Sequence, residues 1–373
     1  AAREHHADAI GMSALLVQTS NHMITVSKMM REQGLEDTPI LIGGAPVNER
    51  HAAYVAMAGE DNPENMRGNV FYCRTAMDGV NVMNALMSAS DPRPIFEKNR
   101  RMLLSKLERA EEMAREEARL LATLPRRTVS FEQSGASRWN PAHAAECARR
   151  RVEMRMRDFA ERIDTRTLFL LNWRFGGTAL WKRQNTDPAE LERLFVQWVA
   201  DCDQHGWIVP QGVMGIYPCQ SEGENIMLYD PADLSHEIAR FHFTTVIGSD
   251  RNDVVCGAQY FLPKSSGEYS AVGVQIGTGG PAVENQIAAF KSAGDSESAL
   301  FLQGLSDRVA EDMAVYLHSL MRTIMGAGDD AGTRWSPGYP GMADIGMNRV
   351  IFDLLDAANL SGVNITDAGE FIP

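Results

Sequence analysis

The sequence predicts two fold classes in succession: a partial doubly wound (Rossmann-like) α/β domain in residues 1–90, then an α+β domain with a mainly antiparallel sheet in residues 163–373. Three observations predict them. Before residue 90, short apolar runs alternate with helical periodicity, which is typical of a parallel sheet with crossover helices. Residues 91–162 are charged or polar, and we expect a helical and extended linker there. Beyond them, apolar runs flank short turns, which is typical of antiparallel hairpins.

The first domain is predicted to repeat a strand and a helix three times. Its strands are expected at 9–17, 39–45 and 69–73, and its helices begin near Ser20, Asn48 and Thr75. The run at 9–17 is almost continuously apolar, as expected of a strand buried on both faces. Ser, Asn and Thr can each cap a helix, because their side-chain oxygens accept hydrogen bonds from the first backbone N–H groups.

Small and hydroxylated residues follow these strands, at 13–19, 43–45 and 74–76. Ligands of parallel sheets bind beyond the carboxyl ends of the strands, and small residues let the backbone approach a ligand closely. We therefore expect a ligand site at this edge. A tight turn at Gly43-Gly44 alone would leave the same pattern, and the dinucleotide fingerprint GxGxxG is absent.

The linker is predicted to be mostly helical. Interleaved Arg, Glu and Lys at 95–124 predict a solvated helix, residues 130–141 predict an extended segment, and 142–162 has a helical pattern again.

The second domain combines two long helices with several strands. We expect helices at 188–202 and 299–325, a hairpin of strands 213–218 and 225–229, and further strands at 254–262 and 269–277. The second helix carries an apolar stripe that predicts core packing, formed by Leu302, Leu305, Val309, Met313, Leu317 and Met321.

Composition excludes some classes of function. The net charge of −13 argues against a nucleic-acid partner, and no apolar run approaches the ~18–20 residues that span a bilayer, so no membrane is expected. Five scattered cysteines without a CxxC pair indicate reduced thiols and a cytoplasmic location. The nine histidines lack metal-site spacing, so we expect no metal held by protein ligands alone.

One loop of the second domain carries several side chains that could bind a ligand. Two prolines and a glycine fix the backbone of the stretch Arg334 to Pro340. Arg334 is a planar donor fork suited to a carboxylate, and Trp335 and Tyr339 offer faces that attract a cation. The stretch predicts a small ligand with a carboxylate and a positive centre; a packed loop with a surface arginine is the alternative.

Motifs in both domains together resemble a known family, the carboxyl-terminal half of cobalamin-dependent methionine synthase. The residues that carry the resemblance are 9–13, Met23, 41–45, His51, 171–173, 212–218, 263–267, 307–311 and 334–340. The resemblance implies that residues 1–90 are the end of a cobalamin-binding domain. It also implies that residues 163–373 are an activation domain that binds S-adenosylmethionine.

The resemblance implies a methyltransferase of methionine biosynthesis. A cobalt-bound methyl group passes to homocysteine, and methyltetrahydrofolate restores it. When cob(I)alamin oxidises to cob(II)alamin, the activation domain supplies S-adenosylmethionine for reductive remethylation, with an electron from a flavodoxin-like donor. Domain movement would bring the methyl donor and cobalt together.

Site residues carry over from the family position by position. Those expected to line the slot for the cobalamin nucleotide tail are Ser13, Val17, Gly43, Gly44, Thr75 and Ala76. Val17 replaces a family threonine, so the hydrogen bond of that threonine is not expected here. The chain lacks the DxHxxG motif that supplies the axial histidine, and neither His5 nor His6 fits it.

In the activation domain, the residues expected to contact S-adenosylmethionine are Asn172, Arg334, Ser336, Gly338 and Tyr339. Arg334 would bind the methionyl carboxylate. Asn172 stands where the family commonly has an aspartate for the amino group, and an amide accepts a hydrogen bond without supplying charge. We therefore expect weaker binding, or help from the auxiliary acids Glu311, Asp329 and Asp330.

No catalytic residue is expected in this chain, because the homocysteine module with its zinc and the folate module are missing. Both ends are expected to be internal to a longer protein or a split subunit: there is no initiating Met, and a strand pattern begins at 371–373. One alternative function is a corrinoid-binding reactivation subunit for another methyltransferase. Another is an interaction protein with inactive sites, given Asn172 and Val17.

Overall fold

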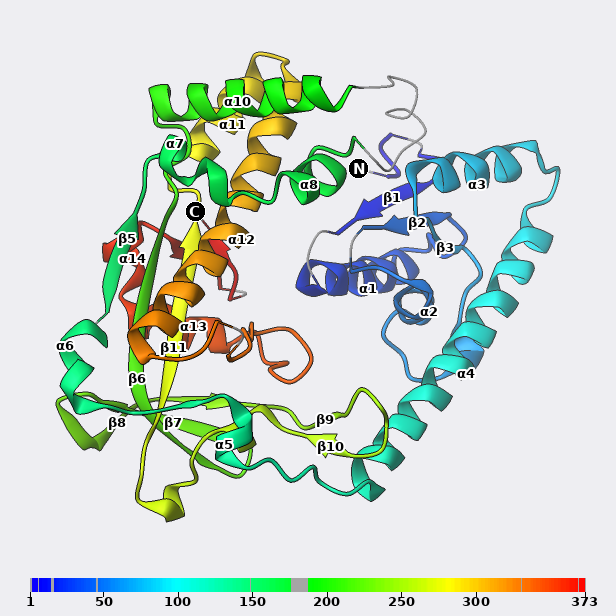
Figure 1. The fold of residues 1–373 in the computed structure, drawn as a ribbon. Coiled ribbons are helices and arrows are strands. Elements are labelled where there is room, and N and C mark those ends of the chain that lie inside the picture. Colours follow the sequence, from blue (N-terminus) through cyan, green and yellow to red (C-terminus); the bar gives the residue numbers. More distant parts are fainter. Residues whose placement is uncertain are drawn as a thin grey trace. The chain divides into compact units, whose positions relative to one another are not determined.

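A computed structural model describes residues 2–5, 7–14, 17–44, 46–147, 149–175, 187–329, 331–367 and 369–372. The chain forms two compact units, Ala1–Thr123 and Leu124–Pro373, whose elements are labelled in Figure 1. None of the described helices combines the length and the apolar character that a bilayer crossing requires.

The first unit is built on a three-stranded parallel sheet in the order β1-β2-β3. Its strands are β1 (Ile10–Ser13), β2 (Ile40–Gly43) and β3 (Val70–Tyr72), and its helices are α1 (Val17–Glu32), α2 (Glu49–Met57), α3 (Ala76–Ser88) and α4 (Arg93–Thr123). A helix follows each strand, as the alternating pattern predicts, because parallel neighbours need a crossover connection. Asn48 caps α2 by accepting a hydrogen bond from the His51 N–H.

The first strand is shorter and less buried than predicted. It ends at Ser13, and its residues alternate between half-buried and exposed, because β1 lies at an edge of the sheet. The expected strand over 9–17 is therefore wrong at its carboxyl end, where α1 already begins at Val17. Ser20, expected as a cap, is buried inside that helix.

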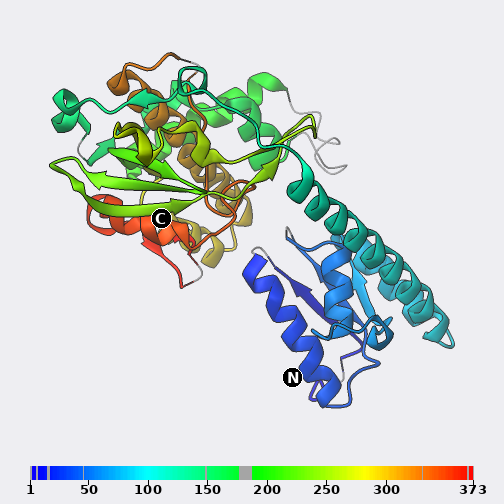
Figure 2. The same cartoon turned by 90° about the horizontal axis from the view of Figure 1, so that it is seen from below.

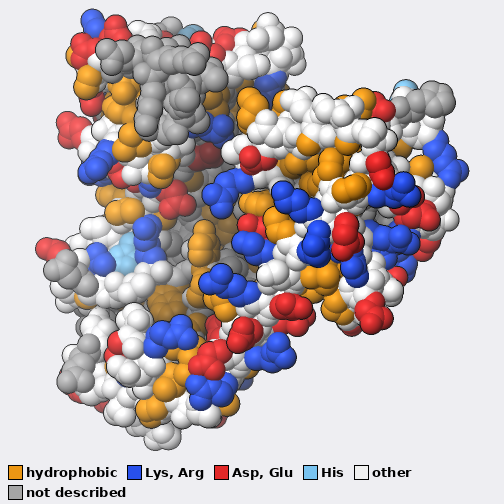
Figure 3. Space-filling view, turned by 90° about the vertical axis from the view of Figure 1, so that its right-hand side faces the viewer, with side chains coloured by type: hydrophobic (Ala, Val, Ile, Leu, Met, Phe, Trp, Pro, Cys, Tyr) orange, Lys and Arg blue, Asp and Glu red, His pale blue; other side chains and the backbone are white. Residues whose placement is uncertain are grey.

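Helix α4 belongs to the first unit along its amino-terminal half. Leu103 and Leu107 are buried in the same core as Ile40 and Ile42. The buried amide of Asn99 donates to the carbonyls of Gly68 (2.9 Å) and Val70 (2.6 Å). The second half of α4 is solvent-exposed, as its charge pattern predicts. Figure 2 shows the length of α4 beside the sheet, and acidic and basic side chains intermingle on the surface drawn in Figure 3.

The second unit is organised around an antiparallel sheet in the order β4-β11-β6-β7-β8, with β5 also paired to β6. Its strands are β4 (Ser137–Arg138), β5 (Arg150–Glu153), β6 (Gln211–Glu222), β7 (Asn225–Asp230), β8 (Asp233–His242) and β11 (Ser270–Thr278). Short pairs are formed by β9 (Val246–Ile247) with β10 (Val254–Val255), and by β12 (Asn364–Ile365) with β13 (Phe371–Ile372). The predicted β6–β7 hairpin is confirmed.

The helices of the second unit are α5 (Phe131–Ser134), α6 (Ala144–Cys147), α7 (Met156–Phe159), α8 (Thr165–Thr167), α10 (Pro188–His205), α11 (Val283–Ser292), α12 (Ser296–Met325), α13 (Met347–Leu355) and α14 (Ala357–Ser361). A π-helix, Leu168–Asn172, follows α8. The predicted Leu/Met stripe of α12 is buried in a core that also holds Trp173 and Phe195.

Two expectations for this unit are wrong. The helical pattern at 142–162 becomes short helical segments on either side of β5, because β5 pairs with β6 and tertiary pairing overrides local propensity. The strand expected at 254–262 stops at Val255, where a 3₁₀ helix, Gly257–Tyr260, begins. Residues 91–162 thus divide between the two units.

Candidate functional site

The predicted cobalamin residues of the first unit gather at the carboxyl edge of its parallel sheet. Ser13 ends β1, Gly43 ends β2, and Thr75 and Ala76 follow β3. All of these except the half-buried Gly43 are exposed. Val17 lies in the first turn of α1, and its side chain falls outside the described part of the structure.

The two glycines at this edge are required by the packing of the backbone. A Cβ atom on Gly44 would lie 1.9 Å from the Ala14 carbonyl oxygen, and its φ of +115° lies in the region that favours glycine. A Cβ on Gly43 would lie 2.6 Å from the Cys73 carbonyl oxygen. The glycines therefore let three strand ends lie close together at this edge.

Thr75 has a structural role at the same edge. Its hydroxyl accepts from the Asp78 N–H (3.2 Å), and the Asp78 carboxylate accepts from the Thr75 N–H (2.8 Å). This capping box begins α3, and the hydrogen bonds from Thr75 lower the pKa of Asp78. Thr75 thus fixes the start of α3 beside the strand ends.

An open cavity of about 630 Å³ lies at the opposite, amino-terminal end of β2 and β3. Its arginines are used in holding the fold. Arg31 donates to the Asn65 carbonyl (3.1 Å), and Arg100 donates to those of Met66 (2.9 Å) and Glu64 (3.3 Å). None of the predicted site residues lines this cavity.

In the second unit, the loop that follows α12 carries Arg334, Ser336, Gly338 and Tyr339. Trp335 anchors it: its ring meets Phe243 edge-on, with 5.2 Å between ring centroids, and a Cβ on Gly341 would lie 2.3 Å from it. Trp335 therefore serves mainly to pack the loop.

The turn after Trp335 is closed by backbone hydrogen bonds. The Gly338 N–H donates to the Met342 carbonyl (2.9 Å), and the Tyr339 N–H donates to the Ser336 carbonyl (3.3 Å). Gly338 has a φ of +89°, which a side chain would strain. The ring of Tyr339 is 67% exposed, and Ser336 is exposed beside it.

Arg334 is exposed, and within the described ranges no carboxylate lies within ion-pair distance of it. Its charge is felt by His318 of α12. Burial, Arg322 and Arg334 lower the pKa of His318 from its ordinary 6.5, against a hydrogen bond to the Ala331 backbone that raises it. Arg334 is therefore a cation ready to accept an anionic partner.

Asn172 lies at the end of the π-helix, against α12. A Cβ on Gly304 would lie 3.1 Å from the Asn172 Cβ and 2.9 Å from the Trp173 Cδ1, so only glycine allows this approach. The Trp173 indole donates to the Phe301 carbonyl (2.9 Å). The Asn172 side-chain oxygen is buried and accepts no hydrogen bond from any described group, which leaves it able to accept one from a ligand.

Helix α12 relates these residues to one another. Gly304, Glu311 and His318 are spaced by seven residues and so share one face of the helix. Asn172 packs at the first position and Arg334 bears on the third, and these positions lie about 20 Å apart along the helix. Asn172 thus contacts one turn of α12 and the charge of Arg334 acts at another, with the exposed Glu311 between these turns.

The other auxiliary acids lie in the loop. Asp329 is exposed, and Asp330 falls outside the described residues. Across the described parts of the chain, no three His, Cys, Asp or Glu side chains could hold a metal ion together.

A buried ion pair that the sequence did not single out supports the π-helix. Arg308 donates two hydrogen bonds to Asp312, at 2.8 and 2.9 Å. Asp312 also accepts from the Asp164 N–H (2.9 Å). Asp164 caps α8 through the Thr167 N–H (3.0 Å), so the network joins α12 to the segment that leads to Asn172. Its sequence signal is only an Arg–Asp pair four residues apart.

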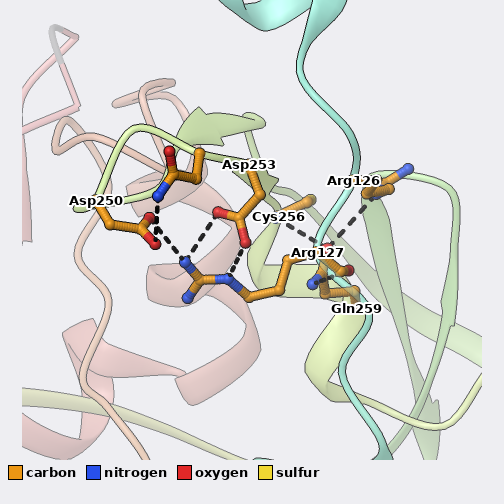
Figure 4. A network of polar contacts seen from close by, with 7 residues as sticks. Arg126, Arg127, Asp250, Asp253, Cys256 and Gln259 are labelled. Carbon is orange, nitrogen blue, oxygen red and sulfur yellow. Dashed lines mark hydrogen bonds and ion pairs between the residues drawn. The ribbon is translucent and has the colours of Figure 1, made fainter.

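A second network fixes the start of this unit. Figure 4 shows the Arg127 guanidinium between Asp253, which it contacts at 2.6 and 2.9 Å, and Asp250 at 3.6 Å. Gln259 donates to the Arg127 carbonyl (3.0 Å), and its side-chain oxygen accepts from the Cys256 N–H (3.2 Å). The chain that follows α4 is thereby tied to the β9–β10 segment.

Among the cysteines whose side chains are described, Cys73, Cys202, Cys219 and Cys256 form no disulfide. Cys202, Cys219 and Cys256 are buried, and burial raises the pKa of Cys202 to about 12. Burial also raises the pKa of Cys219. Cys202 and Cys219 therefore act as core side chains, because a thiol held protonated is a poor nucleophile.

Comparisons with known proteins agree with this description of the second unit. A family model described as "Vitamin B12 dependent methionine synthase, activation domain" matches residues 155–373. Among solved structures, the chain is similar to that of the MetH reactivation domain bound to AdoHcy. The TM-score is 0.54 and the identity 23%, over 67% of this chain and 84% of that chain. This likeness confirms the fold predicted for the second domain, helices with a mainly antiparallel sheet.

A methionine synthase of Mycobacterium tuberculosis (strain ATCC 25618 / H37Rv) is 24% identical over 412 residues, which cover 100% of this chain and 33% of that protein. The chain thus spans about a third of the length of this curated relative. The family model covers more than half of the chain and the whole of the described site in the second unit. The chain therefore belongs to the family of vitamin B12 dependent methionine synthase activation domains.

Proposed function

We propose that the unit Leu124–Pro373 binds S-adenosylmethionine at the Arg334 loop, and that the chain is the cobalamin- and S-adenosylmethionine-binding portion of a methionine synthase. Family membership supports this, as does the AdoHcy bound by the structurally similar reactivation domain. The observation that carries it is the exposed Arg334 guanidinium without a carboxylate partner among the described residues.

Each residue of the loop has a task in this proposal. Arg334 pairs with the methionyl carboxylate through charge-assisted hydrogen bonds. The exposed Tyr339 ring offers its face to the positive sulfonium. Ser336 and Gly338 contribute backbone groups from a turn that is already closed, so little ordering is needed on binding.

The ammonium group of the ligand needs a hydrogen-bond acceptor. The positions of Glu311 and Asn172 along α12, relative to His318, indicate which of them supplies it. Glu311 lies two turns from His318, whereas Asn172 attaches four turns away. We therefore assign the ammonium to Glu311. The unpaired Asn172 oxygen is left to accept a hydrogen bond from a more distant part of the ligand.

The first unit would hold part of a cobalamin. Its exposed carboxyl edge, made close-packed by Gly43 and Gly44, fits a large ligand that lies against backbone. Ser13 and Ala76 would border it. When bound, cobalamin supplies the cobalt centre that carries the methyl group. Transfer from methyltetrahydrofolate to homocysteine would use modules outside this chain, and the electron for remethylation a flavodoxin-like donor.

Isothermal titration of the 373-residue chain with S-adenosylmethionine tests the proposal. The change Arg334→Ala should weaken binding by about 10- to 100-fold, because it removes hydrogen bonds to a charged group. The control is Arg193→Ala in α10, an exposed arginine that, among the described residues, donates only to Ala189 of its own helix (3.1 Å). Equal affinity of wild type and Arg334→Ala would refute the site.

A further inference from the structure

Both ends of the segment 327–332, which leads to Arg334, are held by one residue. The Arg322 carbonyl accepts from the Ala327 N–H (2.9 Å), where Gly326 ends α12 in a left-handed conformation. The Arg322 side chain then donates to the carbonyls of Ala331 (2.5 Å) and Gly332 (3.4 Å). Arg322 therefore contacts the chain at two places, directly after α12 and again at Ala331 and Gly332.

His318, one turn earlier on α12, faces the same point. A Cβ on Gly332 would lie 4.0 Å from the His318 Nε2, and the neighbouring Ala331 backbone is near enough to raise the pKa of His318. Gly332 has a φ of +74°, so the chain changes direction here, two residues before Arg334. His318 and Arg322 of α12 therefore approach the loop where its backbone turns, at residues 331–332.

We propose that Arg322 and His318 are positioning residues that fix the backbone at 331–332 and thereby aim the Arg334 guanidinium at its ligand. The inference rests on the proposed function for the identity of that ligand. The contacts of Arg322 and His318 with residues 331–332 do not depend on which ligand binds, because all of them are within the unliganded chain. A planar arginine fork can hold two successive carbonyls, whereas lysine can offer only a point charge.

His318 adds a dependence on pH. The charged groups that bear on it are Arg322 from its own helix and Arg334 from the loop. A carboxylate bound to Arg334 offsets this positive field, so His318 takes up a proton more readily in the complex. Binding then takes up protons, and affinity should increase as the pH falls from 7.0 to 5.5, around the ordinary histidine value of 6.5.

Amide hydrogen exchange of the unliganded chain tests directly whether Arg322 and His318 order residues 331–332. Arg322→Met should speed exchange in residues 327–334 and weaken S-adenosylmethionine binding about tenfold. Arg322→Lys should be intermediate in both measurements, because it keeps the charge and loses the fork. Arg193→Met is the matched control and should leave both unchanged. Exchange and affinity equal to wild type in Arg322→Met would overturn the proposal.

A second variant covers the case in which Arg322→Met does not fold. His318→Gln keeps a hydrogen-bonding side chain and should lose the increase in affinity between pH 7.0 and 5.5. A pH profile identical to wild type would refute the role of His318. If the wild type binds no S-adenosylmethionine, the proposed function fails. The exchange measurements on Arg322→Lys and His318→Gln then still decide whether these two side chains order the loop.

Discussion

Asp312 is a single buried carboxylate on which two elements of the second unit depend. It receives both guanidinium hydrogen bonds of Arg308 and the Asp164 N–H. The side chains of both partners are almost fully buried. A buried pair of this kind contributes little beyond what apolar packing would, but removal of one partner leaves an uncompensated charge.

The change Asp312→Ala should therefore destabilise the second unit by about 3 kcal/mol. Urea unfolding followed by tryptophan fluorescence measures the effect, because Trp173 lies in the same core. Glu311→Ala, an exposed acid next in the chain, should change stability by less than about 0.5 kcal/mol. Similar losses in the two variants would show that the Arg308–Asp312 pair has no special role.

His318 also predicts how the stability of this unit depends on pH. Its pKa is lowered in the folded state, so the unfolded chain binds more protons in the interval below 6.5. Stability is fully present above that value and is lost as the pH falls through the folded pKa. The urea midpoint of wild type should thus fall more between pH 7.5 and 5.5 than that of His318→Gln. Parallel declines would contradict it.

Much at this scale could be predicted from residue types alone. The Gly-rich turn and exposed Arg334 follow from the composition of their segment. Trp335 is expected to offer a face to a cation, and it stays 37% exposed. Its edge-on packing against Phe243 could not be predicted, because that partner is distant in the sequence. The Asn172 oxygen, which has no hydrogen-bond partner among the described groups, and the contacts of Arg322 with Ala331 and Gly332 carry no sequence signal.

At the carboxyl edge of the parallel sheet, the close packing of the backbone requires a residue without a side chain. Gly44 follows β2 with a φ of +115°, and its Cα lies against Ala14. Gly11, in the middle of β1, is surrounded by open space: a Cβ there would have nothing within 4 Å. Gly44 and Gly11 are therefore a tightly packed glycine and an open one, and alanine substitutions at the two positions can be compared.

Gly44→Ala should destabilise the first unit by more than about 2 kcal/mol, because it adds both strain and a clash with backbone. Gly11→Ala should be neutral or slightly stabilising, since it reduces the freedom of the unfolded chain. Chemical unfolding of the two variants, followed by far-UV circular dichroism, gives the comparison. A neutral Gly44→Ala would show that the strand ends are less closely packed than described.

Long helices were predictable at the scale of elements: α10 and α12 from their apolar stripes, and α4 from its interleaved charges. The burial of Leu103 and Leu107 in the first half of α4 was not predicted, since a solvated helix was expected there. The strands at sheet edges were not predictable. Both β5 and β8 are mostly exposed and rich in charge, so their sequences lack the apolar alternation of a strand. Their backbone hydrogen bonds to β6 and β7 decide their structure, and those partners are distant in the sequence for β5.

The whole molecule consists of two compact units with separate cores. Two such units should unfold in two thermal transitions. S-adenosylmethionine at about 100 times its dissociation constant should raise only the transition of the second unit, by roughly 5–10 °C. Calorimetry with and without ligand checks this, and an equal shift of both transitions would contradict binding confined to the second unit.

The central claim is that S-adenosylmethionine binds the second unit at the loop carrying Arg334. Amide hydrogen exchange of the full chain with and without this ligand tests it most directly. The account predicts slower exchange in residues 327–342, with smaller protection along α12 near Glu311, and no change in the first unit. Protection confined to the carboxyl edge of β1, β2 and β3, or none in the Arg334 loop, would contradict it.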